Sequence, residues 1–208
     1  MNRRKGSIFV KIICIMAFCI VAFMGFCEAV AEDLSDNLVR IHVIANSDRA
    51  EDQNIKLLVR DYIIKEGNAL ADGKELTVST VEQNKETLTE GVNHILKEHG
   101  KTYGTKVETG RFYFPMKRYE NITLPQGEYD AVRIVLGEGK GANWWCVMYP
   151  PLCFTESAKG TMSNNLSDAV SPVTDAVIDN ERIELKPALK AVELWQAFKK
   201  KMENKING

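Results

Sequence analysis

The sequence predicts an α+β protein in which a small mixed or antiparallel sheet is packed by two or three helices and preceded by a signal peptide. Three observations lead to this fold class. A basic start and an apolar run open the chain, alternating patterns typical of strands recur between residues 38 and 149, and a helical pattern follows the first of them. With 208 residues, 45% of them hydrophobic, the chain suffices for one folded body.

Residues 1–31 have the organisation of a secretory signal peptide. Residues 1–5 form a positive start, residues 12–27 are uncharged and mostly apolar, and a small-x-small pattern ends at Ala31. We therefore predict cleavage after Ala31. An uncleaved membrane anchor is the alternative, because from Ile8 the apolar stretch approaches the roughly 20 residues that span a bilayer. Both interpretations place the rest of the chain outside the cytosol.

The charge balance excludes nucleic acid as a partner. The whole chain has 27 basic and 28 acidic side chains, and residues 1–31 hold four of the basic ones and one acid. The exported part is left with 23 against 27, a formal charge of −4. Such a surface has no general attraction for nucleic acid or anionic lipid. We expect membrane contact through the N-terminal segment only.

Residues 38–45 predict the first strand, because apolar and polar side chains alternate along them. Arg40 and His42 share one face of this strand. The polar run 46–48 then ends it with residues that are favoured as helix N-caps. Apolar side chains at helical spacing predict a helix from about Ala50 to Gly67.

The body of the protein, residues 32–154, continues with one more helix and three strands. The helix is expected from about 78 to 98, and strands at 103–114, 128–136 and 143–149. The glycine-rich segment 137–141 is predicted to join the last two strands as a hairpin. Because a strand-like aromatic run follows these glycines, a phosphate-binding loop, which opens a helix, is not favoured.

Residues 155–208 are predicted to form a variable linker and a C-terminal helix. From Thr155 to Asn180 the chain is rich in Ser, Thr, Asn and Asp and lacks periodicity, which is typical of a loop or tether. From Pro187 the apolar positions recur at helical spacing. The helix is expected to end at the lysines 199–201, which suit the negative end of its dipole.

Cys146 and Cys153 are predicted to form a disulfide. The other three cysteines lie in residues 1–31, so these two remain as an even pair outside the reducing cytosol. The alternative is a reactive thiolate at Cys146 activated by His42. That alternative would make the protein an exported cysteine hydrolase.

No other catalytic or cofactor signature is found in the sequence. Serine and zinc hydrolase motifs are absent, and His94 and His99 lack accompanying ligands at zinc-site spacing. We therefore predict no enzyme activity, no metal and no cofactor.

Trp144 and Trp145 are adjacent on a predicted strand, so their rings must point to opposite faces of the sheet. If one ring belongs to the core, the other is available as an anchor for a protein partner. The alternative is that flanking helices cover both rings. An exposed aromatic face would also suit a cell-wall-binding module.

Several stretches together resemble the stage II sporulation protein R family. They are Arg40-Ile-His-Val-Ile-Ala-Asn-Ser-Asp48, Glu51-Asp-Gln53, residues 56–61 and the glycine, tryptophan and cysteine block 137–154. The resemblance covers residues 38–154 and leaves 155–208 unmatched.

The resemblance implies a protein of endospore formation that the forespore exports into the space between two membranes. There the family triggers a membrane-embedded aspartic protease of the mother cell, which cleaves the sigma-E precursor. The chain would then be a signal, with the catalytic residues on its partner. The expected contact residues are Arg40, His42, Asn46, Asp48, Trp144 and Trp145.

Overall fold

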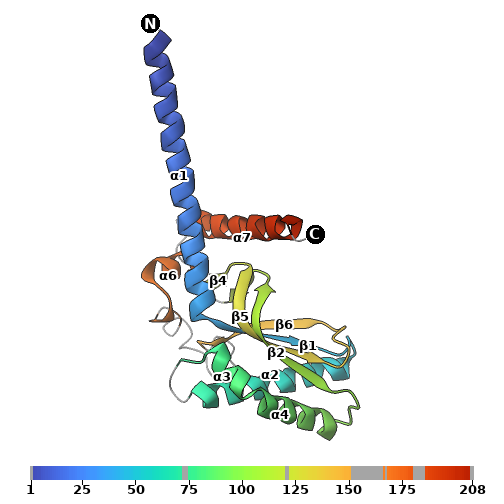
Figure 1. Cartoon of the computed structure of the whole chain (residues 1–208). Coiled ribbons are helices and arrows are strands. Elements are labelled where there is room, and N and C mark those ends of the chain that lie inside the picture. Colours follow the sequence, from blue (N-terminus) through green and yellow to red (C-terminus); the bar gives the residue numbers. More distant parts are fainter. Residues whose placement is uncertain are drawn as a thin grey trace.

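The protein is an α+β fold with helices on both faces of a central sheet (Figure 1). A computed structural model describes residues 2–71, 75–119, 122–150, 166, 168–179 and 186–206, with side chains from residue 8. Helices α2, α3 and α4 cover one face, and the end of α1 with α6 and α7 covers the other. This arrangement confirms the predicted fold class.

The central sheet is mixed. Its strands are β1 (Val39–Ile44), β2 (Thr105–Phe114), β5 (Gly127–Leu136) and β6 (Asn143–Tyr149), in the order β2-β5-β1-β6. Strand β1 runs parallel to β5 and antiparallel to β6. A separate pair, β3 (Lys117–Tyr119) with β4 (Ile122–Leu124), lies beside it. Strand β1 is therefore central.

The predicted glycine hairpin is wrong. Strands β5 and β6 do not pair with each other, because β1 lies between them. The segment 137–142 instead crosses over the C-terminal end of β1. The position of β1 has a physical reason: both of its faces are apolar or shielded, with Ile41 and Val43 on one side and Arg40 and His42 buried on the other.

Helix α2 (Ala50–Ala71) runs one turn beyond its predicted end at Gly67. Gly67 is buried, and a Cβ placed there would lie 2.0 Å from Cε of Met148. The glycine therefore permits close packing of α2 on β6 and does not stop the helix. Residues 78–98, predicted as one helix, form α3 (Val78–Gln83) and α4 (Lys85–Glu98), separated at Asn84.

Two apolar cores lie on the two faces of the sheet. The first joins α2, α3 and α4 to side chains such as Ile41, Val43 and Cys146. The second joins Cys27, Val30 and Leu34 of α1 to α6, α7 and the opposite sheet face. This division confirms the alternation predicted along β1.

The prediction of a loop from Thr155 to Asn180 is wrong in part. Within the described residues of that range, α6 (Pro172–Ile178) begins at the N-cap Ser171, and Val177 and Ile178 are buried in the second core. Helix α7 (Lys186–Ile206) follows and confirms the predicted C-terminal helix, although it continues to Ile206 and does not end at the lysines 199–201. Short apolar segments buried against other elements carry no periodic signal, so the sequence alone misses α6.

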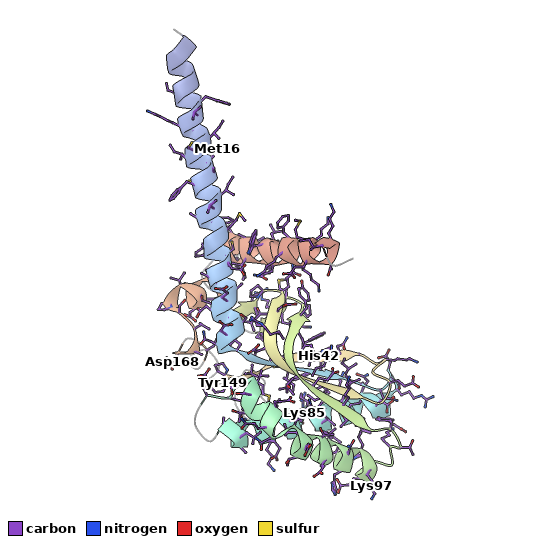
Figure 2. The ribbon with its side chains drawn as sticks, viewed as in Figure 1. Met16, His42, Lys85, Lys97, Tyr149 and Asp168 are labelled. Carbon is purple, nitrogen blue, oxygen red and sulfur yellow. The ribbon has the colours of Figure 1, made fainter. Side chains whose placement is uncertain are left out.

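Helix α1 (Asn2–Asn37) is continuous through the predicted cleavage position after Ala31. It is the described helix that is long and apolar enough to cross a membrane, and a signal sequence would pass the same test. In Figure 2 its apolar part, marked by Met16, projects away from the body.

Candidate functional site

A polar network holds the glycine segment against the end of β1. We call it the glycine-loop junction: residues 46–48, Asp52 and residues 137–142. Asn46 is its centre, because its Nδ2 donates to Oδ2 of Asp52 over 2.8 Å and its Oδ1 accepts the backbone N–H of Glu138 at 3.0 Å. One amide side chain thus joins α2 to the segment that crosses β1.

Backbone contacts complete the glycine-loop junction. The N–H of Gly141 donates to the carbonyl of Ala45 at 2.9 Å, and the N–H of Ala142 donates to Oδ1 of Asp48 at 2.7 Å. A Cβ at Gly141 would lie 2.3 Å from the carbonyl oxygen of Ser47. The glycine is required here because the two backbone segments touch.

Asp52 carries a buried charge that its neighbours stabilise. Its carboxylate accepts hydrogen bonds from Ser47 at 2.6 Å and Tyr103 at 2.7 Å, and Lys101 lies 3.3 Å away. Burial by itself raises the pKa of Asp52, but these donors and Asn46 outweigh it and hold the pKa well below its ordinary range. Asp52 is therefore ionised at neutral pH.

His42 lies on the sheet face opposite the one that α2 covers, and its side chain is buried, with 6% of the residue exposed. Its ring stacks on Trp145 with ring centroids 3.4 Å apart, and Nε2 donates to Oδ1 of Asn143 at 2.8 Å. Desolvation lowers the pKa of His42 to about 4; the bond to Asn143 opposes this shift, and the charge of Arg133 adds to it. His42 is therefore neutral at physiological pH.

Arg40 is fully buried next to His42. Its guanidinium donates to the hydroxyl of Tyr119 at 3.0 Å and lies over the rings of Phe114 and Tyr129, 4.3 and 4.8 Å from their centroids. Among the described residues, Nη1 has no hydrogen-bond partner. The aromatic faces of Phe114 and Tyr129 thus help to stabilise this buried cation.

The predicted contact residues therefore do not form one surface. Arg40 and His42 are interior side chains and are not accessible to a partner in this conformation, so their predicted contact with a partner stays a prediction. Asn46 is half-buried in the glycine-loop junction, whereas Asp48 is exposed. Strand alternation reveals which face a side chain takes, but the sequence gives no sign that α1, α6 and α7 cover that face.

The two tryptophans point to opposite sheet faces, as predicted. Trp144 packs against the first core, where Arg60 lies 5.1 Å from its ring centroid, and Trp145 packs against the second. Both are half-buried, so neither is a fully exposed anchor.

Cys146 and His42 lie on opposite faces of the sheet, because Ile41 is the residue paired with Cys146 and His42 is paired with Trp145. This geometry contradicts the alternative of a Cys146 thiolate activated by His42. Cys146 is buried, and the free cysteines among the described residues are Cys14, Cys19 and Cys27. Cys153 lies outside the described residues, so the bridge between the pair stays a prediction.

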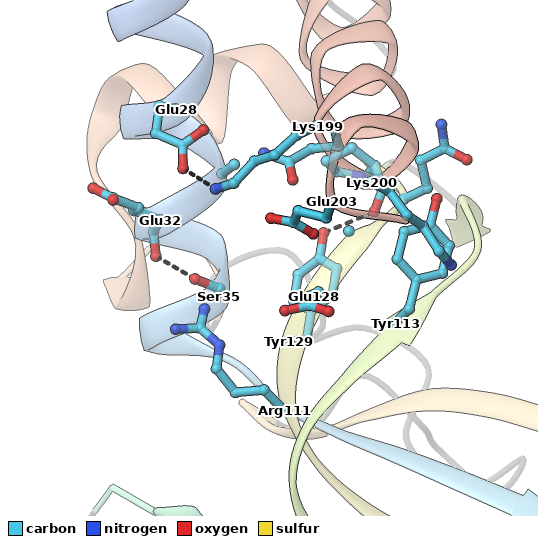
Figure 3. Close-up of a pocket in the computed structure, with 15 residues that line it drawn as sticks. Glu28, Glu32, Ser35, Arg111, Tyr113, Glu128, Tyr129, Lys199, Lys200 and Glu203 are labelled. Atoms are coloured by element: carbon cyan, nitrogen blue, oxygen red, sulfur yellow. Dashed lines mark hydrogen bonds and ion pairs between the residues drawn. The ribbon is translucent and has the colours of Figure 1, made fainter. Parts of the chain in front are cut away.

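A polar cavity of about 210 Å³ lies between α1, α7 and the ends of β2 and β5 (Figure 3). Charged side chains of both signs line it, and two of them form an ion pair, Lys199 with Glu28. Within the described part of the chain no group of His, Cys, Asp and Glu could hold a metal ion. The other charged or phenolic lining residues are Glu32, Arg111, Tyr113, Glu128, Tyr129, Lys200 and Glu203.

Comparison with known proteins identifies the family. A profile of stage II sporulation protein R matches residues 35–159, which includes the whole central sheet. The chain belongs to the stage II sporulation protein R family. It is also 30% identical, over 198 aligned residues, to stage II sporulation protein R of Bacillus subtilis strain 168, covering 86% of this chain and 87% of the relative. No solved structure matches.

Residues that carry the resemblance to stage II sporulation protein R converge at the glycine-loop junction. Asn46, Ser47 and Asp48 meet residues 137–142 there, although they are far apart in the chain. Lys56 of α2 adds a further link, because its Nζ donates to the carbonyl of Ala142 at 3.1 Å. The sequence contains each of these stretches, but only the crossing of β1 brings them together. Membership of this family supports a role in sporulation.

Proposed function

We propose that this protein is an exported signal of endospore formation. In this proposal the forespore exports it into the intermembrane space, where it binds a membrane-embedded aspartic protease of the mother cell. Binding favours the active state of the protease, which then cleaves the sigma-E precursor. A binding partner shifts such an equilibrium only by its tighter affinity for the active form.

The observation that carries the proposal is membership of the stage II sporulation protein R family, together with an N-terminal apolar helix suited to export or anchoring. The geometry offers support of its own. His42 and Cys146 are on opposite faces of the sheet, so these two side chains cannot act together as the base and nucleophile of the hydrolase alternative. A signal that acts by contact needs no such pair.

The glycine-loop junction is the surface best placed for the partner. Strand β1 starts immediately after α1 and carries the chain about 20 Å along the sheet before the junction. The junction therefore lies at the end of the sheet away from α1 (Figure 1). Exposed charges surround it, among them Arg49 and the ion pair of Lys140 with Glu138.

The test is reconstitution in a host that lacks sporulation genes. The full chain, the candidate protease and its precursor substrate are co-expressed, and cleavage of the precursor is followed by immunoblot. We expect cleavage that requires both the chain and the catalytic aspartates of the protease. Cleavage without the chain, or none with all three proteins present and correctly exported, would contradict the proposal.

Charge reversals locate the contact surface. The double substitution Arg49→Glu and Lys140→Glu changes side chains that no buried group depends on, so we expect the protein to fold and to lose most of its activation. Lys65→Glu is the matched control, because Lys65 is exposed on α2 and lies toward the α1 end of the sheet. Equal activation by the double variant and the control would remove the glycine-loop junction from the contact.

A further inference from the structure

Helix α7 carries an apolar stripe that no described part of the chain covers. Leu194, Phe198, Met202 and Ile206 recur every four residues and therefore lie along one side of the helix. Their exposed fractions are 61%, 54%, 45% and 76%. Four large apolar side chains in a continuous exposed row mark an interaction surface.

The stripe adjoins the apolar part of α1. Phe23, Met24 and Cys27 of α1 line one apolar groove with Leu194 and Phe198 of α7. The other side of α7 faces the sheet, where Lys199 and Glu203 line the polar cavity with later residues of α1 (Figure 3). The stripe therefore points to the side of α7 from which the exposed part of α1 projects (Figure 1).

The exposed part of α1 has the length of a bilayer span. Apolar side chains from Ile8 to Met24 are exposed, and at about 1.5 Å per residue this stretch covers about 26 Å. The hydrocarbon core of a bilayer is roughly 30 Å thick. If α1 spans the bilayer, one membrane surface falls near Phe23 to Cys27, which is where α7 meets α1.

Contacts fix α7 at this level of α1. Nε1 of Trp195 donates to Oε2 of Glu28 over 2.6 Å, and Lys199 pairs with the same carboxylate. Val30 and Leu34, on the next turns of α1, are buried in the second core. The two helices are therefore held together, and α7 cannot move away from the span without breaking this joint.

Positive charges flank the stripe. Lys190, Lys201 and Lys205 lie three or four positions from its members, and all three are exposed. An apolar stripe edged by lysines is the signature of a helix that lies in the membrane interface, where the lysines reach the lipid phosphates. A protein partner would not need the stripe to be level with the end of a span.

We propose that α7 is an interfacial helix that binds the surface of the bilayer spanned by α1, with its apolar stripe among the acyl chains. The lipid class that fits is a phospholipid bilayer containing anionic headgroups. This inference does not rest on the proposed function. It departs from the expectation that only the N-terminal segment contacts the membrane.

Fluorescence quenching of Trp195 tests the proposal. The full chain is reconstituted into vesicles of phosphatidylcholine and phosphatidylglycerol whose acyl chains are brominated near the headgroup, which quenches a nearby indole. We expect the bromolipid to quench the wild-type chain, and the quenching to be largely lost in Trp195→Phe. Equal quenching of both chains would place Trp195 away from lipid and overturn the proposal.

A second pair of variants separates binding by the stripe from simple proximity to α1. Met202→Gln with Ile206→Gln removes exposed apolar area from the stripe at positions outside the joint at Glu28, so we expect quenching of Trp195 to fall at least twofold. Glu203→Gln, on the opposite side of α7, should leave it unchanged. Unchanged quenching in the double variant, or quenching that appears only when protein is crowded enough for two copies to meet, would overturn the proposal.

Discussion

Asn46 and Asp52 are joined side chain to side chain, with Nδ2 of the amide 2.8 Å from Oδ2 of the carboxylate. Asp52 lies in the first turn of α2, where a negative charge is favoured by the helix dipole. Asn46 uses its remaining oxygen to accept the N–H of Glu138. This pair therefore links the end of β1, the start of α2 and the segment that crosses between β5 and β6.

Asn46→Ala is expected to lower the free energy of unfolding by about 2 kcal/mol, because it removes two hydrogen bonds, one of them to a buried carboxylate. Urea unfolding of the full chain in mild detergent, followed by tryptophan fluorescence, measures the change. Arg49→Ala is the control, since this side chain is exposed, and it should cost less than about 0.5 kcal/mol. If Asn46→Ala lowered the unfolding free energy as little as Arg49→Ala does, the hydrogen bonds of Asn46 to Asp52 and Glu138 would not stabilise the fold.

Asp52 makes stability depend on acid. The pKa of this carboxyl is lowered in the folded chain, so its contribution is fully present above the unfolded pKa of about 3.9 and is lost as pH falls toward the folded pKa. Asp52→Asn should therefore destabilise the protein at neutral pH, and its difference from wild type should shrink below about pH 4. If the difference in unfolding free energy between wild type and Asp52→Asn were the same at neutral pH and below about pH 4, Asp52 would not be an ionised carboxylate in the folded protein.

The sequence predicts what each segment is better than what each segment touches. Alternation along residues 38–45 correctly separates Ile41 and Val43 from Arg40 and His42, because a strand places neighbours on opposite faces. It cannot reveal that β1 inserts between β5 and β6, since strand order depends on pairings distant in the chain. The wrong hairpin prediction at 137–141 follows from this limit.

The candidate site shows the same contrast between local structure, which the sequence predicts, and contacts between distant segments, which it does not. From local residue chemistry, the stretch 46–48 is predicted to cap a helix and 137–141 to turn the chain between two strands. Their contact through Asn46 depends on the crossing of β1, for which the sequence offers no local signal. Burial of Arg40 is missed for a related reason: the rings of Phe114 and Tyr129 reach it from β2 and β5.

His42 is expected to destabilise the fold on mild acidification. Its pKa is lowered to about 4, so the unfolded chain, with a pKa of about 6.5, takes up the proton first and stability falls between those values. The loss approaches about 3 kcal/mol in total. Unfolding free energies at pH 7 and pH 4.5 measure it.

A variant at His42 assigns that acid sensitivity. His42→Gln keeps a polar side chain and removes the titration, so the decrease in stability between about pH 6.5 and 4 should become smaller. His94→Gln serves as the control, because the His94 side chain is 69% exposed and should leave the decrease unchanged. An equal pH profile for wild type and His42→Gln would show that the acid sensitivity arises elsewhere.

Gly141→Ala is expected to disrupt the glycine-loop junction. The added Cβ would lie 2.3 Å from the carbonyl oxygen of Ser47, closer than unbonded atoms approach, and backbone on both sides must shift. We expect a loss of about 3 kcal/mol in unfolding free energy. At Gly104 the nearest atom to a new Cβ is Oδ1 of Asn93 at 3.7 Å, so Gly104→Ala is the matched control and should cost less than about 1 kcal/mol. If both variants lose the same small amount of unfolding free energy, the close approach at Ser47 does not constrain the fold. If only Gly141→Ala is destabilised, the segment that crosses β1 requires a residue without a side chain at position 141.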